Sequence, residues 1–459
     1  MQPVRVSDTA SAAQPQRERP TSTYAWYVVF ALTAIYMLSY VDRQILSLLV
    51  GPMKRELGIS DTRVGLLQGL AFGIFYTFMG LPLGRLADTR SRRNLVAAGV
   101  VFWSFFTSAC SVARSFWSLF LARMGVGVGE ATLSASAYSL IADYFPKERL
   151  GVAISVYYMG IFFGTSLALL VGGMTVDALV RTPLIHVPLI GAIASWRVTF
   201  LIVGLPGVLF AMLAYTFREP LRRGLLRGAD GQPKHLSFQA TVSEIRLRWQ
   251  SLIGISLGAI FQSACNYAFM SWAPTFFLRT HGWTPGQSGR ALAAILLTFG
   301  CAGMYVGGRL SDRWQKNGIA EGPLRVGAVC AWGTFLLLPA ALMLPQVSWT
   351  LALMAPGMFF LALPMGTQAA ALQHIFPNQV RGQVSALFLF LLNLGGLTIG
   401  PLMPGLLNDR LFHNEKMIGP SMAITIGAAA VLMLVSFVAT YRPYRRHYTE
   451  ALLTAAAEG

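Results

Sequence analysis

Charged residues are scarce in this chain of 459 residues. Only 12% of the residues are Asp, Glu, Lys or Arg, against about 25% in an ordinary soluble domain, while 54% are apolar. Acidic residues are the rarer charge, with 19 against 36 Lys and Arg, which gives a net charge of +17. This composition excludes a soluble enzyme and a disordered chain, because neither can place so much apolar surface in water.

Cysteine and histidine are also few. Cys110, Cys265, Cys301 and Cys330 each lie within or beside an apolar run, with no CxxC pair and no histidine at ligand spacing. They are predicted to be packing residues, so no disulfide framework and no metal site is predicted. A phosphate-binding glycine loop, an HExxH motif and a Ser/His/Asp pattern are missing as well, so the sequence predicts no cofactor and no enzyme activity.

Long apolar runs dominate the chain instead. A helix needs about 20 apolar residues to cross the hydrocarbon core of a bilayer, and the runs show no period-two alternation, which excludes barrel strands. The twelve runs are Trp26–Val50, Val64–Gly84, Leu95–Ala113, Phe116–Ala142, Gly151–Val176, Val198–Phe217, Leu252–Leu278, Ala291–Gly308, Val326–Leu344, Trp349–Gln373, Gln383–Leu407 and Gly419–Tyr441. The sequence predicts an all-α polytopic membrane protein with twelve transmembrane helices.

The hydrophilic interruptions predict the domain organisation. The longest one, between the sixth and seventh runs, divides the chain into two six-span halves and holds an amphipathic pattern over Leu236–Trp249 that predicts a short surface helix. The predicted parts are a disordered tail over residues 1–23, an N-terminal six-helix bundle over 24–217, a linker over 218–250, a C-terminal six-helix bundle over 251–441 and a second tail over 442–459.

The distribution of Lys and Arg predicts the orientation. The N-terminus, the even-numbered loops and the C-terminus hold 24 of the 36 basic residues, and the odd-numbered loops hold 10. The positive-inside rule then places both termini in the cytoplasm, and we expect a bacterial inner (plasma) membrane. Because the basic residues are spread over short loops beside anionic lipid, the net charge does not indicate nucleic acid.

The two halves are predicted to be copies of one six-span unit. Gly84–Asp88 (GRLAD) recurs 224 residues later as Gly308–Asp312 (GRLSD). The further repeats are Gly58-Ile59-Ser60 with Gly282-Trp283-Thr284, Gly65 with Gly289, Phe145-Pro146 with Phe376-Pro377, and Gly151 with Gly382. Such a duplication in parallel topology places a central cavity between halves that can rock about it, as alternating access requires.

The first copy of the loop motif resembles a family signature. Gly84–Arg93 (GRLADTRSRR) is similar to the G-x-x-x-D-R/K-x-G-R-K/R signature of the major facilitator superfamily, although Thr89 and Ser91 depart from it. Arg123–Gly127 resembles the R-x-x-x-G element of the same family. The chain is therefore identified as a member of that superfamily, and the resemblance implies a transporter that works as a monomer.

The resemblance also implies a gate at this loop. The carboxylates would accept hydrogen bonds from helix N-termini or pair with arginine, and so latch the inner gate; ordinary solvated loop charges are the alternative. The residues assigned to the gate are Asp88, Arg92, Arg93, Asp312 and Arg313.

Within the superfamily two branches are similar. Ser39–Arg43 (SYVDR), Gly129–Ala131 and Ala142–Pro146 look like the Spinster-like branch, which exports or redistributes sphingosine phosphate and lysophospholipids. The Tyr-x-Asp-Arg pattern is also similar to the anion:cation symporter branch, which carries organic carboxylates and phosphates.

Four charged residues lie inside the predicted spans, all in the N-terminal half: Asp42, Arg43, Arg123 and Glu130. A charge at the bilayer centre costs at least about 2.5–3.5 kcal/mol, so these four require pairing or a wet cavity. At 1.5 Å per residue, all four fall within about 10 Å of the midplane. We expect them to point jointly into a hydrated chamber.

Roles for the four follow from their chemistry. Burial favours the protonated form of a glutamate, whereas a nearby arginine favours the ionised form. Arg43 is predicted to bind an anionic headgroup, Arg123 to pair with Glu130, and Glu130 and Asp42 to carry protons, so that an anion displaces the carboxylate from its arginine. Static ion pairs between helices are the alternative.

The predicted wall of the C-terminal half is polar without charge. Gln262 and Asn266 share one face of the seventh span, where they contact a headgroup or form interhelical hydrogen bonds. The complete set of predicted substrate-binding residues is Arg43, Tyr40, Tyr36, Arg123, Gln262 and Asn266. The apolar side chains expected on this wall are Phe261, Phe269, Met270 and Trp272.

Together these features predict a proton-coupled secondary transporter of an anionic amphiphile, such as a lysophospholipid or a sphingosine-phosphate-like lipid. Its partners would be that substrate, protons and membrane lipids. A proton-coupled symporter of small organic anions is the main alternative. A non-transporting receptor is a further one, although the chain lacks the large soluble domain expected of it.

Overall fold

The structure is a computed structural model that describes residues 22–180, 182, 184–188, 191–220, 238–377 and 380–458. Nearly all of the predicted N-terminal tail, the middle of the predicted linker and Leu236 lie outside the described residues. The N-terminal half consists of α1 (Ser22–Leu48), α2 (Val50–Leu57), α3 (Asp61–Gln68), α4 (Leu70–Thr89), α5 (Arg92–Ala109), η1 (Cys110–Val112), α6 (Phe116–Tyr144), α7 (Lys147–Leu167), η2 (Ala168–Gly172), α8 (Gly173–Val180), β1 (Leu184–Val187), β2 (Gly191–Ala194), α9 (Ser195–Gly204) and α10 (Gly207–Tyr215).

The second half follows a short helix in the linker segment, α11 (Phe238–Leu247). Its elements are α12 (Trp249–His281), α13 (Pro285–Ile295), η3 (Leu296–Gly300), α14 (Cys301–Lys316), α15 (Gly322–Met343), α16 (Val347–Ala362), α17 (Thr367–Ile375), α18 (Arg381–Leu407), η4 (Asn408–Phe412), η5 (Glu415–Met417) and α19 (Ile418–Glu458).

The predicted all-α polytopic membrane fold is confirmed. Within the described residues, eleven helices are long and apolar enough to cross a membrane. The twelfth predicted span is α6, a helix of 29 residues whose apolar run is interrupted by Arg123 and Glu130. Several helices run past the predicted apolar segments, since backbone hydrogen bonds continue into the polar interface: the eighth span extends over Pro285–Lys316.

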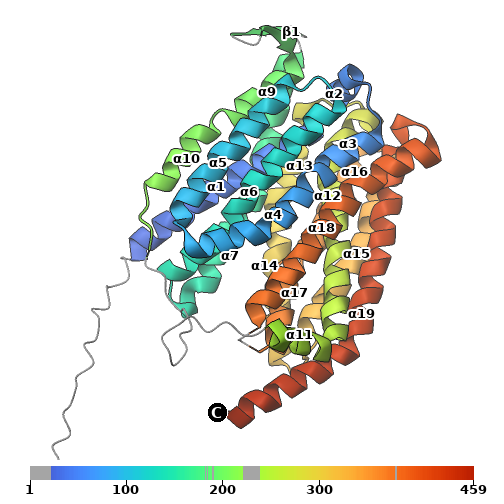
Figure 1. The fold of residues 1–459 in the computed structure, drawn as a ribbon. Coiled ribbons are helices and arrows are strands. Elements are labelled where there is room, and N and C mark those ends of the chain that lie inside the picture. Colours follow the sequence, from blue (N-terminus) through green and yellow to red (C-terminus); the bar gives the residue numbers. More distant parts are fainter. Residues whose placement is uncertain are drawn as a thin grey trace, which may run out of the picture.

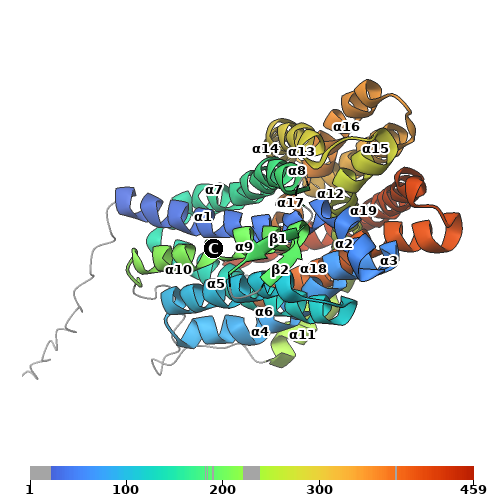
Figure 2. The ribbon, with the colours of Figure 1, turned by 90° about the horizontal axis from the view of Figure 1, so that it is seen from above.

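The two halves lie side by side in both views of the ribbon (Figures 1 and 2). In Figure 1, α1 begins at the lower left of the N-terminal half and α19 ends at the bottom of the C-terminal half, and this end of the bundle is called here the terminal end. A small antiparallel hairpin, in which Leu184 pairs with Ala194, marks the opposite end, called the hairpin end. The apolar runs did not predict this hairpin, because it lies in the loop between the fifth and sixth spans.

The repeated residues end and cap the corresponding helices in both halves. Gly58 and Gly282 have φ values of +60° and +67° and end α2 and α12 in the left-handed conformation that favours glycine. Two residues later, Ser60 and Thr284 accept hydrogen bonds from backbone N–H groups and cap α3 and α13. The duplication seen in the sequence is therefore a duplication of local structure.

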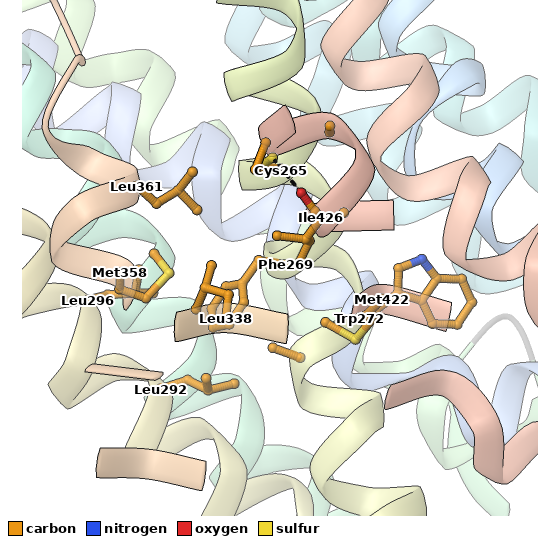
Figure 3. Close-up of a cluster of buried hydrophobic side chains, with 14 of the residues drawn as sticks. Cys265, Phe269, Trp272, Leu292, Leu296, Leu338, Met358, Leu361, Met422 and Ile426 are labelled. Atoms are coloured by element: carbon orange, nitrogen blue, oxygen red, sulfur yellow. Dashed lines mark hydrogen bonds between the residues drawn. The ribbon is translucent and has the colours of Figure 1, made fainter. Parts of the chain in front are cut away.

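The C-terminal half has a dense apolar core. Figure 3 shows Phe269 and Trp272 inside it, packed among residues of α12, α15, α16 and α19 such as Leu338 and Met422. Both aromatic rings are at most 1% exposed, so the expectation that they line a cavity wall is wrong. Their positions on α12 turn them toward neighbouring helices of the same half. Cys265 is also buried there, and all four cysteines are free thiols.

Candidate functional site

The centre of the site is an ion pair between α1 and α6. Arg43 Nε lies 2.6 Å from Glu130 Oε2, and the same carboxylate oxygen accepts a hydrogen bond of 2.5 Å from Ser39 Oγ. Glu130 is only 1% exposed. The expected pairing of Arg123 with Glu130 is thus replaced by Arg43, because the rotation of α1 against α6, which no periodicity in the sequence specifies, turns Arg43 toward Glu130.

Aromatic rings surround the Arg43 guanidinium. Its Cζ atom lies 4.9 Å from the ring centroid of Tyr40, 4.4 Å from that of Phe72 and 4.7 Å from that of Tyr76, a geometry that attracts a cation to the ring faces. Tyr267, from α12 of the other half, lies beside the same guanidinium. Arg43 keeps 12% of its side-chain surface exposed, so it is the accessible partner of the ion pair.

The other two of the four charges, Asp42 of α1 and Arg123 of α6, are more deeply buried than Arg43. Arg123 and Asp42 are 1% and 0% exposed, and Arg123 Nη1 donates to the backbone carbonyl of Asp42 at 3.3 Å. The Arg123 guanidinium also lies 5.7 Å from the Phe72 ring, whose other neighbour is Arg43. The structure therefore gathers the four predicted charges into one cluster. The expectation that all four point into a hydrated chamber is wrong, because Asp42, Arg123 and Glu130 are at most 1% exposed, whereas the Arg43 side chain is 12% exposed.

Tyrosines form a second part of the site that sequence reasoning found only at Tyr36 and Tyr40. Tyr36 stacks on a further tyrosine of α7 at 4.4 Å between ring centroids, and Tyr76 hydrogen-bonds Ser134 at 2.8 Å. The additional members are Tyr76 from α4, Tyr138 from α6, and Tyr157 and Tyr158 from α7. A signal for one of them was available, because Tyr138 follows Ser134 by four residues on the α6 stripe that holds Glu130.

The C-terminal half contributes less than predicted. Gln262 is buried, and its Nε2 atom donates to the backbone carbonyl of Leu361 at 3.0 Å. Of the two roles predicted for it, headgroup contact and an interhelical hydrogen bond, the structure shows the hydrogen bond. Asn266 is half-buried and forms no side-chain hydrogen bond within the part of the chain that the structure describes. Of the predicted apolar wall, Phe261 and Met270 remain half-buried.

At the terminal end, the charged residues predicted to form the gate do not pair with one another. Asp88, Asp312 and Arg313 are exposed, and over the described ranges none of them forms an ion pair. Arg92 is instead buried within its own half, where it pairs with Asp143 and, at 2.8 Å, with Glu219.

Arg93 joins the same network through its backbone N–H, which donates to Glu219 at 2.8 Å. Burial alone would raise the pKa of Glu219, but the hydrogen bonds from Arg93 and Arg92 hold it below its usual value.

At the hairpin end the two halves are tied together. Asp61 of α3, fully buried, accepts two hydrogen bonds from Arg279 of α12 at 2.7 and 2.9 Å. It also contacts Lys54 at 2.5 Å and Asn408 Nδ2 at 2.6 Å. This cluster was not predictable from the sequence, because its residues lie in loops and near helix ends, where charged residues are common.

Two aspartates reinforce this end in a symmetric way. Asp409 of the C-terminal half accepts from the backbone N–H of Thr62 at 2.6 Å, near the start of α3. Asp177 of the N-terminal half accepts from the backbone N–H of Gly286 at 3.0 Å, near the start of α13. These two aspartates are 232 residues apart, close to the spacing of the repeats. Each half therefore supplies a carboxylate to a helix N-terminus of the other half.

Glycines permit the same close approach. A Cβ atom on Gly65 would lie 2.5 Å from the carbonyl of Pro401, and one on Gly289 would lie 1.9 Å from that of Leu169. Among the described residues, the hydrogen bonds between the halves all lie in the part of the bundle toward the hairpin end. The two halves are therefore joined at the hairpin end, whereas Asp88, Asp312 and Arg313 at the terminal end form no ion pair among the described residues.

Comparison with known proteins decides the family. Residues 32–401 match the pattern that defines the Major Facilitator Superfamily. The chain belongs to the major facilitator superfamily. The predicted membership is confirmed, and the superfamily's members are transporters.

This superfamily member is similar to transporters of several kinds, spinster homologues among them. It is 28% identical to an MFS-type efflux pump of Mycolicibacterium smegmatis, over 93% of this chain and 95% of the relative. It is also 28% identical to human protein spinster homolog 1, over 84% of this chain and 74% of the relative. A probable L-galactonate transporter of Escherichia coli is 27% identical, over 74% of this chain and 73% of the relative.

A solved structure shares the fold over almost the whole chain. A bacterial homologue of the human lysosomal transporter Spinster, in an inward-facing and unoccupied conformation, matches with a TM-score of 0.77 at 24% identity. The match covers 94% of this chain and 99% of the solved one. This superfamily member therefore shares its overall fold with that solved structure.

Proposed function

We propose that this superfamily member is a proton-coupled secondary transporter of an anionic amphiphile, of the lysophospholipid or sphingosine-phosphate kind. The observation that carries the proposal is the ion pair between Arg43 and Glu130, whose arginine is the more exposed partner. We further propose that both termini lie in the cytoplasm of a bacterial plasma membrane, so that the terminal end faces inward and the predicted gate at Asp88 opens there.

Competition for Arg43 couples the substrate to the proton. A phosphate or carboxylate that binds the Arg43 guanidinium takes it from Glu130, which retains only the hydrogen bond from Ser39. A buried carboxylate without its counter-ion favours the protonated form. Anion binding therefore promotes proton uptake by Glu130, while Asp42, on the other face of α1, is proposed as a second carrier.

Several features favour an amphiphile. The wall beside Arg43 is polar, with hydroxyls of Tyr40 and Tyr76, whereas Phe261 and Met270 supply apolar surface in the other half. A ligand with one charged end and one apolar end matches this asymmetry. The sequence resemblance to the Spinster-like branch implies the same class of substrate, and spinster homologues are among the relatives.

Small organic anions are the second candidate. Their support comes from the relatives named as a probable L-galactonate transporter and, in Bacillus subtilis, a hexuronate transporter. The tyrosine hydroxyls around Arg43 would suit the hydroxyl groups of a sugar acid.

The test is transport by the purified chain in proteoliposomes under a pH gradient, with lysophosphatidylglycerol and glucuronate as probes. We expect Arg43→Ala to reduce uptake about 100-fold, the scale of a lost charge-assisted contact. Glu130→Gln should leave exchange of the probe intact and remove its dependence on pH. Arg63→Ala, which removes an exposed arginine at the hairpin end, is the matched control and should transport normally.

The two probes separate the candidate functions. Protection against thermal unfolding by lysophosphatidylglycerol alone supports the lipid substrate, and protection by glucuronate alone supports the organic anion. Full pH-dependent transport by both Arg43→Ala and Glu130→Gln would disprove the proposed site.

A further inference from the structure

The last helix, α19, presents one exposed face along its apolar part. Val431, Val435 and Val438 lie on this face and are 44%, 58% and 48% exposed, whereas Met433 and Phe437 on the other side are at most 1% exposed. Their spacing of four and three residues places the three valines in one stripe. Because α19 lies in a candidate membrane span, an exposed valine stripe of this kind faces lipid.

Arginine continues the same stripe where the apolar run ends. Arg442 and Arg446 follow Val438 by four and eight residues, and both are exposed. The apolar run stops at Tyr441, so the two guanidinium groups lie at the level where hydrocarbon meets the lipid headgroups.

The arrangement of α19 in the bundle agrees with this position. Along its apolar part, α19 lies on the outer side of the C-terminal half, away from the N-terminal half (Figures 1 and 2). It then bends at the terminal end, and Pro443 inside the helix accounts for the bend. The arginines therefore lie where the helix leaves the membrane.

Carboxylates do not neutralise the two arginines. Arg446 Nε lies 2.8 Å from Glu450 Oε1, but the two side chains are 79% and 40% exposed, so water screens the pair. Arg442 forms no ion pair within the described residues. Its guanidinium is thus available to an anion from outside the protein.

The neighbouring charges leave this region positive. Glu321, before α15, is shared by Arg445 of α19 at 2.5 Å and Arg325 at 2.9 Å. Together with the pair at Glu450, four arginines meet two carboxylates. An open depression of about 430 Å³ at this place is lined by Arg442, Arg445, Arg446, Thr449 and Glu450.

A lipid phosphate is the anion whose chemistry fits. Guanidinium groups bind phosphate oxygens through paired N–H donors. A phospholipid also carries acyl chains, which match the valine stripe that leads up to the arginines. A soluble phosphate would use the arginines and leave the valines uncovered.

We propose that Arg442 and Arg446 bind the phosphate of an anionic membrane phospholipid such as phosphatidylglycerol, whose acyl chains lie along Val431, Val435 and Val438. The lipid is a structural ligand and not the transported substrate. This site is separate from Arg43, and the proposal does not rest on the proposed function. Because Arg445 of the same turn pairs with Glu321, the bound lipid stabilises the contact of α19 with α15 at the terminal end.

Lipid binding to the purified, delipidated full chain tests the site. Native mass spectrometry compares dioleoyl phosphatidylglycerol with dioleoyl phosphatidylcholine, which have the same acyl chains. Each basic residue beside an anionic lipid contributes about fivefold in affinity, so two of them predict a preference of about 25-fold for the first phosphatidylglycerol. Equal affinity for the two lipids would overturn the proposal.

Paired variants locate the lipid. Arg442→Gln combined with Arg446→Gln should remove most of the preference, whereas Arg442→Lys combined with Arg446→Lys keeps the charge and should keep most of it.

The matched control is Arg410→Gln combined with Lys416→Gln, which removes the same charge from exposed residues at the hairpin end and should leave the preference unchanged. An equal loss in the two Gln pairs would mean that net charge alone attracts the lipid, and would contradict the site.

Two further measurements identify the source of the phosphate and keep this inference apart from transport. Glycerol 3-phosphate at millimolar concentration should not displace the lipid, because it has no acyl chains to cover the valines. Displacement would show a site for a soluble anion and overturn the proposal. Arg43→Ala should retain the full lipid preference, so failure of the proposed transport site and failure of this lipid site give different results.

Discussion

The N-terminal and C-terminal halves share one fold, but they differ in what they bury. The N-terminal half buries four charges within its predicted spans, with Arg43 and Glu130 in contact at 2.6 Å. The C-terminal half buries aromatic side chains such as Phe269 and Trp272, and the side chain of Gln262 donates to the backbone carbonyl of Leu361. Duplication therefore supplies the frame twice, while the chemistry has been kept in one copy.

A second contrast lies at the terminal end. In the N-terminal half, Arg92 at the start of α5 pairs with Glu219 after α10. In the C-terminal half the charges are exchanged, because Glu321 before α15 pairs with Arg445 of α19. Both pairs join the third and sixth spans of a half, so the same mechanical tie is made with opposite polarity.

The largest predicted effect concerns these ties. Burial alone would raise the pKa of Glu321, but hydrogen bonds from Arg445 and Arg325 lower it to about 2. A carboxyl whose pKa is lowered by folding stabilises the protein above its ordinary value of 4.5, and this stabilisation is lost as the pH falls from there to about 2. Arg445 is exposed, so water screens its charge and weakens the ion pair. We therefore expect Glu321→Gln to lower the free energy of unfolding by only about 2 kcal/mol at pH 7.

Thermal unfolding in detergent at pH 7 and at low pH measures this effect. The loss should vanish at the low pH, where the carboxyl of the unmodified protein is protonated as well. Glu219→Gln should show the same sign of pH dependence in the other half. A deficit for Glu321→Gln that is equal at both pH values would mean that packing, and not the charge, makes the tie.

The next prediction concerns the two aspartates at the hairpin end. Asp177→Asn and Asp409→Asn each weaken a charged contact to a helix N-terminus, worth about 1 kcal/mol. Each should shift the population toward an open hairpin end about fivefold, and the double variant should shift it further. Distances between spin labels at Arg63 and Lys416, which are both exposed, report the opening. A shift for only one of the two variants would show that the symmetric contacts are not equivalent in energy.

The smallest predicted effect is at the disengaged gate. Asp88 is exposed, so Asp88→Asn should change the thermal stability of this conformation by no more than about 0.5 kcal/mol. If Asp88 latches the alternative conformation, the variant favours the one described here, and the spin-label distance across the hairpin end should shorten on average. Asp312→Asn is the comparison in the second copy. Unchanged accessibility from both sides in Asp88→Asn would refute the latch.

Particular residues show how far sequence reasoning reached. Asp42, Arg43, Arg123 and Glu130 were identifiable because charge is rare in apolar runs, and the structure does bring them together. The partner of Glu130 was not predictable, since helical periodicity gives the face of each helix but not its rotation against a neighbour. Trp272 was misplaced for the same reason, because an aromatic ring on a membrane helix packs equally well in a core or on a wall.

The sequence by itself determined that the chain lies in a membrane, how many helices span it, and that its two halves are a duplication. These follow from the length and spacing of the apolar runs, and each is a property of the chain read in one dimension. Only the tertiary structure decided which arginine meets Glu130, that Asp42 is completely buried, and that Asp61 binds Arg279 across the halves. Those contacts join residues far apart in the chain, and distances of a few ångströms between packed helices determine them.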